Sequence, residues 1–332
     1  AGKRDNRRNM HRSGEYSERG FKMGKTAIVF SGQGAQYPGM GKSLYENSES
    51  AKSLYDYAET LRPGTLEQSF RGSEEELKLT KNTQPCLYLA DICAALALRE
   101  NGIEADAVAG FSLGELAALA YAGAYTPEKG FEIIIKRAEL MQIAAEENDT
   151  AMAAVLKTDS KTVEGICAEL REKGESIYPV NYNSPAQTVV AGSKEALALF
   201  KEKAKENSAR VIDLAVGAAF HSPYMNGAAG KFAAYLSNIE FSTPEIPVYA
   251  NYTASPYFGE TVDTLKMQMN NPVRWCDTIN EMGAEGYTDF IEAGVGKTLC
   301  GLIKKILPEA NVYQAEDYES VCAAAKAVKE RA

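Results

Sequence analysis

Short hydrophobic runs alternate along this chain with longer stretches in which hydrophobic residues recur every three or four positions. The runs at 25–30 (KTAIVF) and 105–110 (ADAVAG) predict buried strands, each followed by a glycine-rich turn. Helical spacing marks 83–100 and 127–147, the second opened by Pro127 at a first-turn position, and two further helical stretches are expected before 83–100. Strands that alternate with helices predict an α/β fold built on a mostly parallel sheet.

The pattern changes in the middle of the chain, where elements of the order β-α-β-β-α-β predict a small split-βαβ subdomain. Its expected elements are a strand at 151–157, a helix near 159–172, two strands within 177–193, a helix at 194–206 and a closing strand at 209–216. The α/β pattern then resumes, with strands expected at 247–251 and 289–294. The predicted division is a core of residues 23–147 and 217–332 with an inserted subdomain of residues 148–216.

The composition is that of a globular protein, except in one segment at the start of the chain. Of 332 residues, 45% are hydrophobic and 24% charged, and no window approaches 18 consecutive apolar residues, so we expect no membrane span. Residues 1–22 hold seven Lys or Arg against three Asp or Glu. This segment is either a basic arm for nucleic acid or an anionic surface, or a disordered extension or cloning remnant before Met23, which we favour.

The body after this extension is acidic. The whole chain has a formal net charge of −9 and the first 22 residues carry +4, which leaves −13 from Met23 onward. Such a body is a poor nucleic-acid binder. The six cysteines form no C-x-x-C pair and only two histidines are present, so neither disulfide nor zinc-site spacing is found. Cysteine usage therefore predicts reduced thiols in a cytoplasmic protein without a bound metal.

Two segments resemble the end of a phosphate-binding P-loop, GMGKS at 39–43 and GVGKT at 294–298. That motif also needs a glycine five positions before the one that precedes the lysine. Gln36 and Ile291 occupy those positions, so both matches fail. We do not expect a nucleotide-binding enzyme.

A serine between two glycines is the strongest chemical signal. The segment from Gly110 to Gly114 fits G-x-S-x-G in the required context, a strand before and a helix after. A sharp turn there strains the backbone, brings the two glycines face to face and lifts the Ser112 oxygen clear of the sheet. The alternative is a Gly-Ser turn without chemistry. If Ser112 is a nucleophile that needs an imidazole base, His221 is the candidate, because His11 lies in the extension.

Eight segments then carry a resemblance to a known family. They occur in this order between residues 32 and 299: GQGAQYPGMG, TQP, GFSLGELAALAYAGA, KRAELMQ, NYNSPAQTVVAG, FHSPYM, NNPVRW and EAGVGKTL. Together they resemble the malonyl-CoA:acyl-carrier-protein transacylases of fatty-acid synthesis and the related acyltransferase domains of polyketide synthases. The resemblance implies an α/β-hydrolase-like core with an inserted ferredoxin-like subdomain.

The resemblance also implies roles for individual residues. Ser112 would carry the acyl ester, and His221 would act as general base and acid. The amides of Gln33 and Leu113 would stabilise the oxyanion. Gln268 would orient His221 through its backbone carbonyl.

Substrate selection is expected from three further positions. Arg137 would hold the malonyl carboxylate at the far end of the pocket, because a guanidinium fork suits a carboxylate; without the resemblance it reads as a solvated helix residue. Phe220 resembles the malonyl-selective form of its motif, with ordinary core packing as the alternative. The family commonly has histidine where this chain has Phe111, which removes a polar ring from the pocket.

The resulting hypothesis is a ping-pong transfer of malonyl from malonyl-CoA to acyl carrier protein, with CoA as a substrate and no cofactor. We expect a monomer that contacts neither nucleic acid nor membrane, and a local basic patch for the carrier protein that includes Lys304 and Lys305 on the last long helix. The alternatives are a free-standing acyltransferase that loads a polyketide synthase carrier protein, a serine esterase or thioesterase, and a carrier-protein-binding module without activity.

Overall fold

A computed structural model describes residues 24–215 and 218–331. The predicted basic extension of residues 1–22, with His11, lies outside the described residues, as does the predicted boundary at 216/217. Within the described ranges, no helix combines the length and apolar character needed to cross a membrane.

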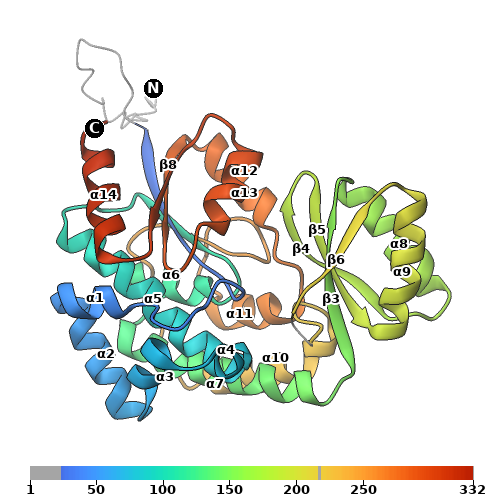
Figure 1. Cartoon of the computed structure of the whole chain (residues 1–332), viewed down its shortest axis with the longest axis horizontal. Helices are drawn as coiled ribbons and strands as arrows, with labels where there is room; N and C mark the ends of the chain where they lie inside the picture. The colour runs from blue at the N-terminus through green and yellow to red at the C-terminus, as the bar shows by residue number, and fades with distance from the viewer. Residues whose placement is uncertain (1–23, 216–217, 332) are drawn as a thin grey trace, which may run out of the picture.

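A five-stranded sheet in the order β7-β2-β1-β8-β9 forms the centre of the larger part (Figure 1). Every pair in it is parallel. Its strands are β1 Lys25–Phe30, β2 Ala107–Gly110, β7 Val248–Tyr249, β8 Tyr287–Ala293 and β9 Asn311–Ala315. The strand β9 was not predicted, because most of its residues are only partly buried at the sheet edge and form no apolar run.

Helices cover both faces of this sheet. Along β1, Ile28 and Phe30 belong to the cluster packed on α5, whereas Ala27 and Val29 pack with Trp275 of α12 on the opposite face. This alternation follows from the pleat of a strand and makes the core a three-layer structure. The helices are α1 Lys42–Asn47, α2 Glu49–Leu61, α3 Thr65–Arg71, α4 Glu74–Lys78, α5 Thr80–Glu100, α6 Gly114–Tyr121, α7 Pro127–Glu146, α10 Asn226–Leu236, α11 Thr261–Asn270, α12 Trp275–Ala284, α13 Thr298–Ile306 and α14 Tyr318–Lys329, with a 3₁₀ turn η1 at Pro223–Met225.

The expectation of two helical stretches before α5 was wrong, since four short helices, α1 to α4, occupy residues 42–78. A glycine or a serine stands at the N-cap of each of the four helices. Ser48 caps α2, and Ser73 forms a capping box on α4. These local side-chain hydrogen bonds start new helices within stretches for which the hydrophobic periodicity alone predicts longer, continuous ones.

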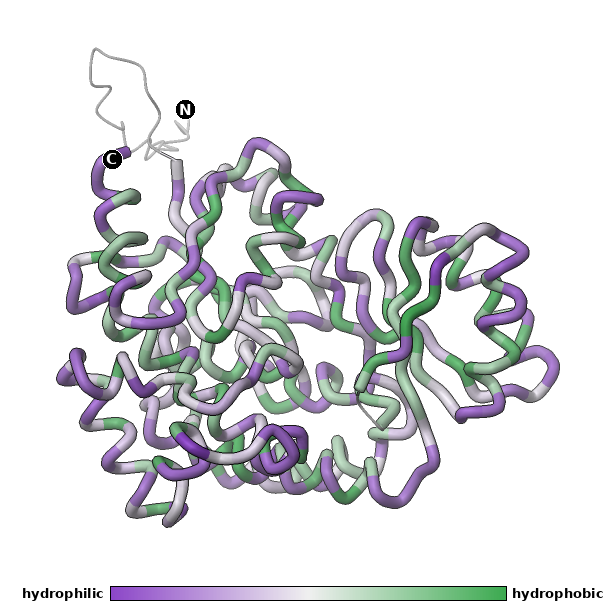
Figure 2. The backbone as a smooth tube through the Cα atoms, viewed as in Figure 1, coloured by the Kyte–Doolittle hydropathy of each residue, from purple (hydrophilic) through white to green (hydrophobic). Residues whose placement is uncertain are grey.

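A second, four-stranded sheet is antiparallel and has the order β4-β5-β3-β6. Its elements are β3 Thr150–Leu156, α8 Ser160–Glu172, β4 Ile177–Ser184, β5 Gln187–Ser193, α9 Lys194–Glu206 and β6 Arg210–Asp213. The helices α8 and α9 cover the face turned away from the larger part (Figure 1). Figure 2 shows both helices alternating between hydrophilic and hydrophobic positions, as expected when one side packs on a sheet and the other meets solvent.

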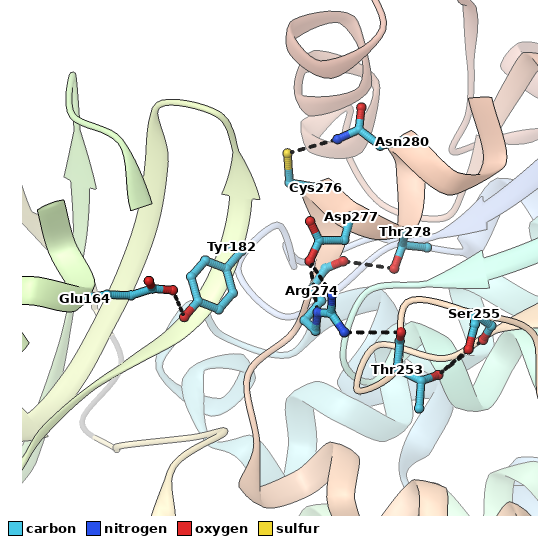
Figure 3. A network of polar contacts seen from close by, with 9 residues as sticks. All are labelled: Glu164, Tyr182, Thr253, Ser255, Arg274, Cys276, Asp277, Thr278 and Asn280. Carbon is cyan, nitrogen blue, oxygen red and sulfur yellow. Dashed lines mark hydrogen bonds and ion pairs between the residues drawn. The ribbon is translucent and has the colours of Figure 1, made fainter. Parts of the chain in front are cut away.

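The two sheets are joined by a segment that follows α11. Val273 extends the small sheet, because its amide donates to the carbonyl of Val180 at 2.9 Å and its carbonyl accepts from the amide of Tyr182 at 2.9 Å. Next to it, Arg274 pairs with Asp277 at 2.9 Å (Figure 3). The segment that carries Gln268 into the core is therefore also fixed to β4.

Candidate active site

The serine turn has the geometry that its two glycines allow. The strand β2 ends at Gly110, α6 begins at Gly114, and Ser112 between them has a φ of 55°, in the left-handed region. A Cβ on Gly110 would collide with the backbone of Gly114, and a Cβ on Gly114 with the carbonyls of Phe30 and Ser31. Only glycine fits at either position, and the strained turn raises the serine above the sheet edge.

His221 lies directly beside this serine. Its Nε2 is 2.8 Å from Ser112 Oγ, and its Nδ1 is 2.8 Å from the backbone oxygen of Gln268. Because a carbonyl only accepts, Nδ1 carries the proton and the Nε2 lone pair faces the serine. Burial and the nearby Arg137 lower the pKa of His221 to about 4, so the imidazole is neutral at pH 7.

The two residues expected to supply the oxyanion hole both border the serine cavity. Gln33, in the loop after β1, and Leu113, at the N-terminus of α6, line the cavity together with Ser112. Within residues 24–215 and 218–331 neither amide has a hydrogen-bond partner. They are available to an anion, as the helix N-terminus favours.

Arg137 is completely buried on α7, in contact with the nucleophile. Its Nη1 donates to Gln84 Oε1 at 2.8 Å, and its Nη2 donates to Gln268 Oε1 at 3.0 Å and to Ser112 Oγ at 3.2 Å. Its Nε has no partner among the described residues. Burial lowers the pKa of Arg137 to about 10, opposed by the buried carboxyl of Glu115, so the guanidinium stays charged.

The expected place of this guanidinium at the far end of the pocket was wrong. Its Nη2 lies 3.2 Å from Ser112 Oγ. A malonyl group is short, and one methylene separates its carboxylate from the ester carbonyl. A cation that is to meet this carboxylate must therefore stand next to the serine.

The cavity over the serine has a volume of about 280 Å³ and lies between the two sheets. Phe111 and Phe220 line it, and the Phe111 ring packs edge-on against Trp275 with 5.6 Å between ring centroids. The small sheet contributes Asn181 and Asn183 from β4, whose Oδ1 atoms are buried and have no partner within the described residues. The cavity wall is therefore mixed, since on the small sheet Asn181 and Asn183 lie among the apolar residues Met152, Ala154 and Val189. In the described part of the chain no group of three or more His, Cys, Asp or Glu could hold a metal ion.

Sequence reasoning missed three side chains of this site. Gln84, in the segment TQP, holds Arg137, and Gln268 contributes its side chain as well as its carbonyl. Glu115, completely buried in the first turn of α6, accepts from the amide of Asn251 at 2.8 Å, and burial raises its pKa to about 7. A lone acidic residue inside an otherwise apolar helix is the signal that could have identified Glu115.

Comparison with known proteins gives consistent results. Residues 27–329 match the acyl transferase domain family. The chain is 38% identical over 312 residues to the malonyl CoA-acyl carrier protein transacylase of Bacillus subtilis (strain 168), covering 93% of this chain and 98% of that protein. A solved transacylase of the same name from Clostridium perfringens superposes with a TM-score of 0.88 at 33% identity, covering 92% and 98% of the two chains. A malonyl-transacylase solved with a type II PKS acyl-carrier protein gives 0.87 at 32% identity, covering 91% and 99%.

Proposed function

The chain belongs to the acyl transferase family, and on that premise we propose that it transfers malonyl from malonyl-CoA to the phosphopantetheine thiol of acyl carrier protein through an ester on Ser112. The observation that carries the proposal is the contact between Ser112 Oγ and His221 Nε2 at 2.8 Å, with the Arg137 guanidinium 3.2 Å from the same oxygen. A nucleophile, its base and a cation for the acyl carboxylate thus meet at one atom.

In the first half-reaction Ser112 Oγ attacks the thioester carbonyl while its proton passes to His221 Nε2. The carbonyl oxygen becomes an oxyanion held by the amides of Gln33 and Leu113. When the C–S bond breaks, the imidazolium returns the proton to the departing CoA sulfur. The backbone oxygen of Gln268 keeps the imidazole oriented and stabilises it while it is charged.

Arg137 supports selection of malonyl over acetyl groups. Its guanidinium is buried against two amide oxygens and a hydroxyl, and among the described residues no carboxylate pairs with it directly. A malonyl carboxylate would supply the charge partner in a place that water does not reach, whereas an acetyl group would leave the cation unpaired. Phe220 lines the same space and would disfavour a branch on the acyl chain, whereas Phe111 places an apolar ring where the family commonly has histidine.

In the second half-reaction the carrier thiol attacks the ester carbonyl while His221 accepts its proton, and that proton passes to Ser112 Oγ when the ester C–O bond breaks. Both donors and acceptors of malonyl present a pantetheine arm with two amides. The unpartnered Oδ1 atoms of Asn181 and Asn183 are acceptors for such N–H groups along the cavity wall. No resident cofactor has a part in this scheme, since CoA arrives and leaves as substrate.

We further propose a finer assignment for each of the two parts of the fold. The strand–serine–helix turn at Ser112 supports an α/β-hydrolase-like core. The order β4-β5-β3-β6 with two helices on one face supports a ferredoxin-like small subdomain. We also propose that the enzyme acts as a monomer, because every residue of the scheme comes from one chain.

Polyketide carrier proteins are the second candidate partner, since a similar transacylase was solved with a type II PKS acyl-carrier protein. The test is transfer in vitro from malonyl-CoA to purified holo carrier proteins of both kinds, followed by intact mass. We expect malonylated carrier with the wild-type enzyme and none with Ser112→Ala. Free malonate and CoA without a malonylated carrier would show a hydrolase instead.

A further inference from the structure

The serine turn is held by the side chain of one asparagine, Asn251, that lies outside the eight segments of the family resemblance. Asn251 Oδ1 accepts from the amide of Ser112 at 2.7 Å, and its Nδ2 donates to the carbonyl of Gly110 at 2.6 Å. Asn251 is completely buried. We propose that Asn251 is a positioning residue for the nucleophile, which its side-chain amide holds in the strained conformation that reaches His221; this inference rests on the proposed function of Ser112.

The side chain continues a β-ladder after its strand has ended. The strand β7 pairs with β2 in parallel through Val108 with Val248 and Ala109 with Tyr249 only. After Tyr249 the backbone turns away, while β2 runs on into the serine turn. The Asn251 amide accepts from one backbone group and donates to the next, as a peptide of a neighbouring strand would. It therefore satisfies the two buried polar groups that flank the sharpest part of the turn.

The backbone of Asn251 is itself held by the buried carboxylate of Glu115. Its backbone amide donates to Glu115 Oε2 at 2.8 Å, and the other oxygen of Glu115 accepts from the Tyr257 hydroxyl. Glu115 lies on the first turn of α6, the helix that starts directly after the serine. Glu115 thus connects Asn251 to the helix that follows Ser112, which couples the position of the asparagine to that of the nucleophile.

The opposite side of the turn is held by the residue that also orients the base. Gln268 Nε2 donates to the carbonyl of Ser112 at 2.6 Å, while the backbone oxygen of Gln268 accepts from His221. Asn251 holds the N–H of Ser112 and Gln268 holds its C=O. With both groups fixed, a φ of 55° persists at a residue that would otherwise relax toward negative values.

Removal of the Asn251 side-chain amide is expected to slow the chemical step and to leave substrate binding unchanged. Asn251→Ala leaves the amide of Ser112 and the carbonyl of Gly110 without partners and lets the hydroxyl move away from the imidazole. Because a misplacement of about 1 Å costs roughly 100-fold in rate, kcat should fall about 100-fold while KM for malonyl-CoA stays within about threefold. The matched control is Asn101→Ala at the end of α5, which loses a side-chain hydrogen bond to Ala97 but should keep the wild-type kcat.

A second variant gives a pH signature, which is measured over the pH range in which circular dichroism shows the variant to be folded. Asn251→Asp keeps the acceptor for Ser112 but turns a carboxylate oxygen toward the carbonyl of Gly110, where a donor is needed. Protonation of that carboxyl restores an O–H donor. The ratio of variant to wild-type kcat should therefore rise as the pH is lowered, and the same ratio for Asn101→Ala should stay flat.

The experiment is steady-state kinetics of malonyl transfer with the wild-type chain and the three variants, folding being followed by circular dichroism. A wild-type enzyme without transfer activity would contradict the proposed function itself. An active wild type together with a folded Asn251→Ala of unchanged kcat, or a flat pH ratio for a folded Asn251→Asp, would overturn the positioning role alone. Should Asn251→Ala not fold, the pH ratio of Asn251→Asp decides.

Discussion

His221 is held as a neutral base by its surroundings. Desolvation and the positive charge of Arg137 lower its pKa from about 6.5 to about 4. Serine activation is therefore available over a wide pH range, since the lone pair is lost only below pH 4. The same shift links protonation to folding, because the unfolded chain binds a proton to this residue at higher pH than the folded chain does.

This linkage predicts an acid-dependent loss of stability. Between pH 6.5 and pH 4 the unfolded state takes up the His221 proton and the folded state does not, so the contribution of His221 should fall by about 3 kcal/mol as the pH is lowered. The measurement is the free energy of unfolding of wild type minus that of His221→Gln at several pH values. The subtraction is needed because the raised pKa of Glu115 makes the folded state more stable, not less, as the pH is lowered through part of this range. A difference that does not vary with pH would contradict the depressed pKa.

Arg137 should decide which acyl group is accepted. Loss of one partner from a buried ion pair costs about 3–5 kcal/mol, so Arg137→Ala should lower kcat/KM for malonyl-CoA more than about 100-fold. The kcat/KM for acetyl-CoA should change little or increase. The two substrates are compared on the same enzyme preparation, which removes differences in folded fraction. An equal loss of kcat/KM for both substrates would show that Arg137 acts on Ser112 and not on the acyl carboxylate.

How far the site could be predicted depended on the kind of residue. Ser112 and its flanking glycines could be predicted from local sterics, and His221 by elimination among two histidines. The place of Arg137 beside the serine could not be predicted, because it depends on how α7 packs against α5 and α11. Asn251 lies 139 positions from Ser112, and although the predicted strand at 247–251 includes it, nothing in the local sequence indicates that its side chain binds the serine turn.

At the scale of elements, the turn between β2 and α6 depends on Gly114. A methyl group there meets the carbonyl oxygens of Phe30 and Ser31, which are fixed at the end of β1. Gly114→Ala should therefore abolish transfer and destabilise the fold by about 3 kcal/mol. The matched control is Gly165→Ala in α8, where a Cβ meets nothing within 4 Å and a gain of up to about 1 kcal/mol is expected. Denaturant unfolding of both variants checks the contrast, and a Gly114→Ala enzyme with wild-type activity would contradict it.

Long elements with a clear hydrophobic periodicity could be predicted from the sequence, whereas short elements and strands at the sheet edge could not. The helices α5, α7, α8 and α9 lie within a few residues of their predicted spans because each buries an apolar face. The predicted strand at 247–251 is reduced to Val248–Tyr249. Its place in the sheet comes from pairing with β2, which is a tertiary interaction that a local pattern does not contain.

At the scale of the whole molecule, the cavity exists because two sheets meet. The core supplies the serine, the base and the cation, and β4 supplies a polar wall through Asn181 and Asn183. The bridge between Val273 and β4 fixes the small sheet to the segment after Gln268. Both substrates must enter between the sheets, so the carrier protein must dock near that opening.

Carrier docking is expected on the end of α13. This helix places Leu299 and Leu302 in the cavity wall and exposes Lys304 and Lys305 one turn further on. The residues lie on α13 and not, as predicted, on the last long helix, which is α14. Reversal of both charges (Lys304→Glu with Lys305→Glu) should raise KM for an acidic carrier protein, most at low salt, and leave KM for malonyl-CoA unchanged. Unchanged carrier KM at low salt would exclude this surface.

In the proposed reaction one serine, activated by His221 and next to Arg137, carries malonyl between two thiols. The most direct measurement is peptide-resolved mass spectrometry of the enzyme mixed with malonyl-CoA alone, before and after addition of holo carrier protein. We predict a single malonyl ester on Ser112 that disappears as the carrier protein gains the group. A missing adduct, or an adduct that maps to any other residue, would contradict the account.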